Sequence, residues 1–276
     1  MRKCPLDPYG DRVASNLACI GLAVSDGTEF TQLVTAAHRS ARQIGAYDGV
    51  HVARWQDNSG AALILGWRSG ELLDLIPAYT AASGGLLSRC HLINESIASA
   101  AVVDAEGGQL TAMAFDAEQY RQLQALGQPV SGPARITALG VAVEIYQDDD
   151  VFAASPGSLL DPSADPAREP PQHYLDRGWT WPPRVASESF FSYGEFGEPA
   201  QASAHARLSG TVLKANRTVC TLTGQPFTIA SVRTTGFEAD MCLAGSEHSG
   251  LPVPGNIISG TVYLSVTIDA SDLKPE

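Results

Sequence analysis

Basic residues are scarce in this chain: 18 lysines and arginines stand against 30 aspartates and glutamates, which gives a net charge of −12. Only Lys3, Lys214 and Lys274 are lysines, and this usage, together with abundant alanine and glycine, indicates a GC-rich bacterial coding sequence. No run of basic side chains is concentrated enough to hold a phosphate backbone or an anionic lipid surface. We therefore expect no nucleic acid and no membrane among its partners.

Long apolar runs are also missing. No segment reaches the roughly 18–20 apolar residues that cross a bilayer, and residues 1–8 lack the apolar stretch of a signal peptide. We therefore expect a cytoplasmic protein. The five cysteines are odd in number and no two stand at CxxC spacing, so we expect neither a disulfide framework nor a thiolate zinc site.

The sequence contains none of the short motifs that mark common catalytic or cofactor sites, and its six histidines are scattered. Cys90-His91 is the only adjacent Cys/His pair. Neighbours on a strand point to opposite faces, which favours a buried cysteine beside a polar histidine. The acidic run Asp148–Asp150 lacks the spaced acids of a calcium loop and indicates a solvated turn. We expect no metal and no cofactor.

The N-terminal half alternates strand and helix signals. Residues 28–44 place apolar side chains at helical spacing, and Gly45 ends this pattern, which predicts an amphipathic helix. Around it we expect a β-α-β-β-β unit, followed by a β-β-α-β unit whose helix begins after Asp116. The two units could be an imperfect duplication, although no residue-level repeat links them. The strands that we expect are 17–24, 50–55, 62–67, 72–76, 97–103, 109–115 and 136–146.

From His205 onward the sequence changes to short β-branched runs between turn residues. This sequence pattern is typical of a small antiparallel β-barrel of the oligonucleotide/oligosaccharide-binding (OB) type. Half of a β-sandwich is the alternative. The predicted fold class is α+β. It comprises an N-terminal mixed α/β-sheet domain (11–155), a Pro-rich and aromatic connector (156–202) and the β-barrel domain (203–276). The strands expected in the barrel are 208–213, 227–234, 239–243 and 257–268.

Seven of the twenty aromatic residues (8 Tyr, 8 Phe and 4 Trp) fall between Tyr174 and Phe196, directly behind the proline-rich run 161–171. We call residues 174–196 the aromatic block. Two interpretations are open: the rings form the seam between two domains, or they are an exposed surface for a partner. Large rings that follow a linker usually bury themselves, which favours the seam.

The aromatic block and the residues beside it are also the best candidate site. Trp179 and Trp181 alternate, so in an extended segment they share a face. Arg177 and Arg184 could hold a carboxylate between aromatic walls, or Arg177 could pair with Asp176. We predict ligand or partner contacts for His173, Tyr174, Asp176, Arg177, Trp179, Trp181, Arg184 and Tyr193.

Three functions from different classes are compatible with this sequence. We favour a non-catalytic cytoplasmic bacterial binding or assembly protein, whose protein or small-molecule partner contacts the connector and the interdomain cleft. A structural subunit of a homo-oligomer, pairing barrel edges across a two-fold axis, is a third hypothesis. The main alternative is an enzyme acting on a small acidic substrate, with its site assembled from His173, Asp176, Arg177, Arg184 and, as acid/base, Glu188.

Overall fold

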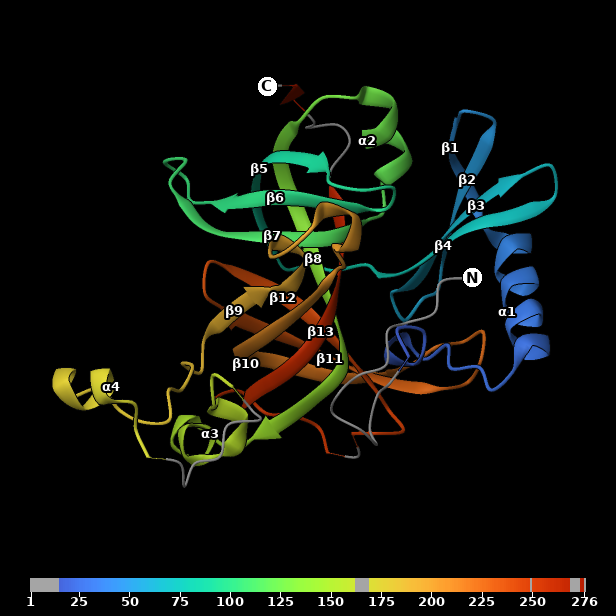
Figure 1. Ribbon diagram of the computed structural model, residues 1–276. Coiled ribbons are helices and arrows are strands. Elements are labelled where there is room, and N and C mark those ends of the chain that lie inside the picture. Colours follow the sequence, from blue (N-terminus) through green and yellow to red (C-terminus); the bar gives the residue numbers. More distant parts are fainter. Residues whose placement is uncertain (1–14, 162–168, 249, 269–273, 276) are drawn as a thin grey trace.

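The computed structural model describes residues 15–161, 169–248, 250–268 and 274–275. Within them the protein is mixed α/β and mostly sheet, with one antiparallel four-stranded sheet and one mixed ten-stranded sheet. In Figure 1 the small sheet and its helix lie on the right, and the large sheet fills the centre. None of the helices in these residues has the length and apolar character needed to cross a membrane.

The small sheet is an antiparallel meander with one helix beside it (Figure 1). Asp26 caps this helix, because its side chain accepts hydrogen bonds from the backbone N–H groups of Thr28 and Glu29 at 2.7 and 2.9 Å. The apolar side of the helix joins a core cluster with Leu63 and Leu65 of the sheet. The elements are α1 (Gly27–Ser40), β1 (Arg42–Tyr47), β2 (Val50–Gln56), β3 (Ala61–Arg68) and β4 (Glu71–Tyr79).

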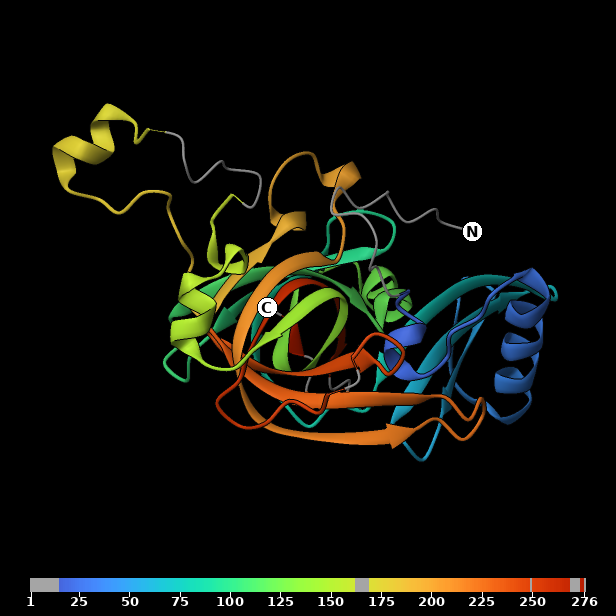
Figure 2. The ribbon, with the colours of Figure 1, turned by 90° about the horizontal axis from the view of Figure 1, so that it is seen from below.

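The large sheet is organised around two long strands, β8 (Val130–Tyr146) and β13 (Ile257–Ile268), which pair antiparallel along their length. The other strands curve around this pair (Figure 2). One set (β5, β6 and β7) closes a first ring with β8 and β13, and β10, β11 and β12 close a second ring with them. The bounds are β5 (Gly84–Leu92), β6 (Ile97–Val103), β7 (Gln109–Ala117), α2 (Tyr120–Leu126), α3 (Asp149–Ala154), α4 (Gln172–Arg177), β9 (Ser189–Ser192), β10 (His205–Val219), β11 (Pro226–Thr234), β12 (Phe237–Ala244) and β14 (Lys274–Pro275).

The two rings have the same topology. In each, the first strand of a three-strand meander pairs antiparallel with the last strand of its own half, and the third pairs parallel with the last strand of the other half. A buried aspartate lies in each parallel pair: Asp116 beside Ser265, and Asp240 beside Thr137. Thr137 and Ser265 pair with each other. The segments β5–β8 and β10–β13 therefore repeat one strand topology about a pseudo-two-fold axis, and they differ from the two units that the sequence suggests.

One apolar core runs through both rings. It includes Met113 and Phe115 from the first ring, Met241 from the second, and Ile136 and Leu264 from the shared pair. A second cluster fills the space between α1, the small sheet and the second ring. Strands on both sides of the predicted connector thus share one sheet and one core.

The small OB-like barrel predicted for residues 203–276 is not confirmed. The strand positions agree well, since 257–268 is β13 and 227–234 and 239–243 lie within β11 and β12. However, these strands close a ring only when β8 is inserted between β12 and β13. Alternation of apolar and polar residues locates a strand, but it carries no information about which distant strand pairs with it.

The apolar run 17–24, expected as a strand, is not one. Ala18–Ile20 forms a 3-10 helix that ends at Gly21, where φ is 71°. Cys19, Ile20 and Leu22 are fully buried in the second core cluster. A segment that is buried on all sides is apolar throughout, and periodicity then cannot distinguish a strand from a turn.

The acidic run Asp148–Asp150 is solvated as expected, since Asp149 and Asp150 are exposed, but it begins a helix rather than forming a turn. The Asp148 side chain caps α3 by accepting a hydrogen bond from the backbone N–H of Val151 at 2.9 Å. Asp149 and Asp150 occupy the first turn of this helix, where carboxylates interact favourably with the helix dipole.

Candidate functional site

The proline-rich connector leaves the body of the protein through a narrow stem. At the stem, Leu159 and Arg184 form an isolated antiparallel bridge. The backbone N–H of Leu160 donates to the carbonyl of Pro183 at 2.8 Å, and the N–H of Val185 donates to the carbonyl of Ser158 at 2.7 Å. We call residues 158–160 with 183–185 the stem and the described residues 169–182 the arm. Figures 1 and 2 show the arm, with α4, standing clear of both sheets.

Two arginines fix the stem. Arg184 donates to the carbonyl oxygen of Ser155 at 2.7 Å and to the hydroxyl of Ser158. Arg207 on β10 donates to the carbonyl oxygens of Leu160 and Gly157 at 3.0 and 2.8 Å. Hydrogen bonds from a charged donor are stronger than neutral ones, so these two arginines stabilise the position of the stem and of the arm that it carries.

The rings of the arm pack on one another around Tyr174. The Tyr174 ring makes edge contacts with Trp179 and Trp181, at centroid distances of 5.4 and 5.0 Å, and with His173 at 4.8 Å. The guanidinium of Arg177 lies over the Trp179 ring, 4.7 Å from its centroid, in a cation–π arrangement. These contacts pre-organise the tip of the arm as an aromatic and cationic cluster, which we call the tip cluster.

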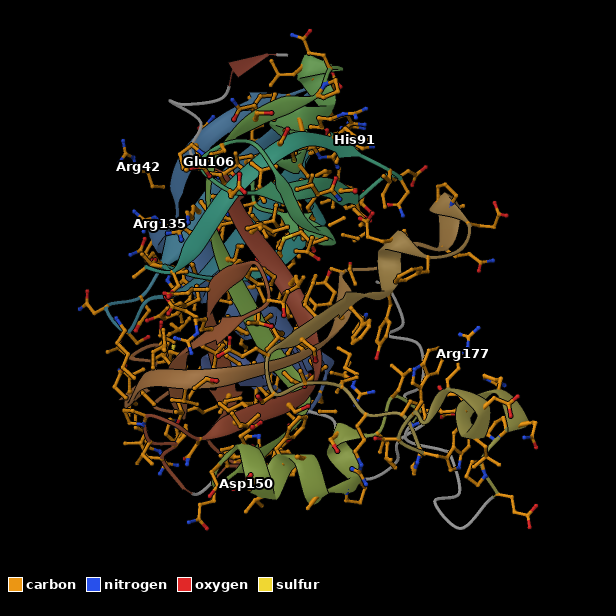
Figure 3. All side chains as sticks on the ribbon, turned by 90° about the vertical axis from the view of Figure 1, so that its left-hand side faces the viewer. Arg42, His91, Glu106, Arg135, Asp150 and Arg177 are labelled. Atoms are coloured by element: carbon orange, nitrogen blue, oxygen red, sulfur yellow. The ribbon has the colours of Figure 1, made fainter. Side chains whose placement is uncertain are left out.

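The tip cluster is exposed rather than buried at a seam. Trp179 is 52% exposed, and Leu175 beside it is 58% exposed. Figure 3 shows the Arg177 side chain on the arm, well apart from the two sheets. The seam interpretation is therefore wrong for these rings. The described arm, residues 169–182, stands clear of both sheets, so the apolar core does not reach these rings.

The structure brings together some of the predicted site residues and separates others. His173, Tyr174, Arg177, Trp179 and Trp181 form the tip cluster. Asp176 is also on α4, but its carboxylate accepts a hydrogen bond from Gln172 at 2.8 Å. The remaining two lie elsewhere, Arg184 in the stem and Tyr193 in a 3-10 turn after β9.

Neither the carboxylate pocket between Arg177 and Arg184 nor the acid/base at Glu188 is formed as expected. Arg184 donates to the backbone carbonyl of Ser155 next to the stem, so it does not face Arg177 across a carboxylate pocket. Glu188, the suggested acid/base, forms an ion pair with Arg233 at 2.8 Å and accepts from Thr211 at 2.7 Å. The Arg233 hydrogen bond holds the pKa of Glu188 below its usual value.

An open groove of about 1210 Å³ lies next to the stem, and sequence reasoning missed it. Its floor includes residues 142–146 of β8 and 259–261 of β13, and Arg207 of β10 also lines it. Phe191, Tyr193 and Phe196 line it as well, and Phe196 is 71% exposed. The C-terminal part of the aromatic block is thus a groove wall. No local signal could reveal a groove whose floor joins strands more than 100 residues apart in sequence.

The groove is lined by more acidic than basic groups. Glu144, Asp161 and Glu247 supply three carboxylates against the guanidinium of Arg207, and His248 also lines it. The positive charge of Arg207 is already directed at two stem carbonyls. Aromatic walls with an excess of carboxylates suit an apolar segment that carries a positive charge.

The groove contains a tyrosine whose proton is held tightly. Burial, together with the 2.6 Å hydrogen bond that the Tyr146 hydroxyl donates to Glu144, raises the pKa of Tyr146 to about 12. Burial also raises the pKa of Tyr79 to about 12. Both values lie above the ordinary value of about 10 for an unfolded chain. The neutral forms are therefore favoured by the folded state.

Below about pH 10 we expect these two tyrosines to leave the free energy of unfolding unchanged with pH. As the pH rises from about 10 towards about 12, we expect them to lower it. Absorbance titration of tyrosinate should show a late-ionising class, and Tyr146→Phe should remove one member of it. Chemical denaturation at several pH values gives the stability. Ionisation of all tyrosines in one step near the ordinary pKa would contradict this prediction.

The Cys90-His91 pair behaves as an ordinary strand neighbour pair. Cys90 is fully buried, and burial raises the pKa of its thiol to about 12. His91 is exposed near the end of β5 (Figure 3), and its Nδ1 lies 2.8 Å from the carbonyl oxygen of Arg89. A thiol with this pKa is not an activated nucleophile. In the part of the chain that the structure describes, no group of three His, Cys, Asp or Glu side chains is placed to hold a metal ion.

Comparison of the chain with protein-family models, with curated proteins and with solved structures finds no match.

Proposed function

We propose that this chain is a non-catalytic binding or assembly protein of the bacterial cytoplasm, and that the tip cluster of the arm is its main contact with a partner. One observation carries this proposal: Trp179 is half exposed in a cluster that is already ordered by its own ring contacts. Trp, Tyr and Arg dominate the binding energy of protein interfaces. An ordered cluster of these three residue types loses little side-chain entropy when a partner binds.

The partner that fits best is a protein rather than a small molecule. The arm that carries the tip cluster stands away from the body (Figure 1), whereas small molecules bind in concave sites. The adjoining groove, at about 1210 Å³, also exceeds the roughly 300–1,000 Å³ of small-molecule pockets. A peptide segment or the surface of another protein can contact both.

No observation favours the enzyme hypothesis over this one. Its five suggested residues do not share a cleft, since Arg184 belongs to the stem and Glu188 is paired with Arg233. The other three residues, His173, Asp176 and Arg177, lie on the exposed helix α4. A catalytic site needs its groups to converge on one reacting atom.

Site-specific photo-cross-linking tests the proposal. A photoreactive amino acid in place of Leu175, which is 58% exposed beside the tip cluster, should give a discrete cross-linked product in cells. The matched control is the same amino acid in place of Leu110 on β7, which is 47% exposed and outside the arm and the groove. We expect no product there. Equal products at both positions, or none at Leu175, would rule out the arm as a specific contact surface.

A further inference from the structure

We propose that the groove of one copy of this chain binds the arm of a second copy, so that two chains exchange arms in a symmetric dimer. This inference rests on the proposed function and names the partner. It follows from the fit between two surfaces of the same chain: an exposed aromatic and cationic tip cluster, and an open aromatic and acidic groove.

Charge is the first part of the fit. The tip cluster presents the guanidinium of Arg177 over the Trp179 ring, and the neighbouring carboxylate of Asp176 accepts a hydrogen bond from Gln172. The groove offers the carboxylates of Glu144, Asp161 and Glu247. The chain as a whole carries a net charge of −12, so most of its surface repels a second copy. A contact that joins the cationic tip of one copy to the acidic groove of the other overcomes this repulsion locally.

Shape and chemistry are the second part. The tip cluster inserts Tyr174, Trp179 and Trp181, which need aromatic or apolar neighbours. The groove supplies Phe191, Tyr193 and the exposed ring of Phe196. Each surface has an exposed ring in a single chain, Trp179 on the tip cluster and Tyr193 and Phe196 in the groove, and exposed apolar patches of this kind mark interaction sites.

The place of the arm in the fold is the third part. The stem forms one rim of the groove, since Leu160 lines it and accepts a hydrogen bond from Arg207. The stem directs the arm outward from this rim (Figure 2). The arm and the groove are therefore side by side on one face. Two such faces related by a two-fold axis present each arm to the other copy's groove, which gives a closed, isologous dimer with two identical contacts.

Light scattering coupled to size-exclusion chromatography tests the dimer. We expect purified wild-type protein to be a dimer. Trp179→Ala should raise the dimer dissociation constant by at least about 30-fold, as expected for an interface hot spot, and Glu144→Lys in the groove should do the same. Leu110→Ala, a comparably exposed leucine on β7, should leave it unchanged. Circular dichroism establishes that each variant is folded, since Trp179, Glu144 and Leu110 are all exposed.

Mixing two defective variants distinguishes a dimer that exchanges arms from a dimer formed through another surface. Trp179→Ala has a defective arm but an intact groove, and Glu144→Lys has an intact arm but a defective groove. Each variant alone has no intact contact, whereas an equimolar mixture can form a heterodimer with one intact contact and should dimerise more tightly than either variant alone. A dimer that survives Trp179→Ala, or a mixture that stays monomeric, would overturn the proposal.

A wild-type protein that stays monomeric at high concentration would also overturn it, and acrylamide quenching then separates the two proposals. In that monomer the arm tryptophans could be exposed and Leu175 could cross-link to a different protein. This result would support the binding function, with that protein rather than a second copy as the partner. Protected tryptophans would mean that the arm binds its own groove. That result would remove both the exchange and the proposed contact surface.

Discussion

Replacing Gly260 with alanine should prevent this protein from folding stably. Gly260 lies in the middle of β13 with a φ of 151°, a conformation that residues with a side chain rarely adopt. A Cβ atom there would lie 2.1 Å from the carbonyl oxygen of Ala142 and 2.7 Å from the Cα of Val143, both in β8. Neither is the flexible end of a side chain, so the central pair of strands must separate.

We expect this substitution to lower the free energy of unfolding by more than about 4 kcal/mol, a large part of the roughly 5–15 kcal/mol by which domains are stable. Chemical denaturation followed by circular dichroism measures the change. Gly27→Ala is the control, because nothing lies within 4 Å of a Cβ at that position and alanine favours the helix that begins there. A Gly260 variant as stable as the Gly27 variant would show that the close approach of β8 and β13 is not required.

The second large effect is expected at Asp240, one of the two buried aspartates related by the pseudo-two-fold axis. Its carboxylate accepts hydrogen bonds from the backbone N–H groups of Ala82 and Ser83, at 2.6 and 3.2 Å, and from the Ser83 hydroxyl at 3.0 Å. The Ser83 hydroxyl also lies 2.8 Å from that of Ser231. This network ties the segment between the small sheet and β5 to the second ring.

Asp240→Ala removes the acceptor of all three bonds and leaves the buried Ser83 N–H without one, so we expect a loss of about 3 kcal/mol in the free energy of unfolding. Glu238→Ala is the matched control, because Glu238 is an exposed carboxylate on the same strand; a change within about 0.5 kcal/mol is expected there. Urea titration of both variants gives the comparison. Equal stability of the two variants would contradict the role assigned to this network.

The local sequence pattern predicts where most strands and helices of this fold lie, but not which strands pair to close the two rings. Strands β2, β3, β6 and β13 lie where alternation and turn residues place them, and Gly127 ends α2 as expected. The edge strand β1, in contrast, is largely exposed and carries no clear alternation. The parallel pairs β7–β13 and β12–β8 join residues about a hundred or more positions apart. Long-range pairing of this kind leaves no local trace in a single sequence.

For the candidate site, composition indicates the aromatic rings but not their surroundings. The aromatic block was identifiable because its density is unusual, and five of the eight predicted residues form one cluster. Arg184 and Tyr193 lie apart because the chain doubles back at the stem. The groove depends on β8 and β13 meeting, and the three-dimensional path of the chain decides this.

The β8–β13 pair has a consequence for how the protein is made. Both rings need β13, which is the last long strand of the chain. Neither half can close while the ribosome is still translating the residues before Ile257, and until then the edges of β7, β8 and β10 that pair with β13 lack a partner. Unpaired edges and late, long-range contacts make a nascent chain slow to fold and prone to aggregate. A truncation within β13 therefore damages the first ring as severely as the second.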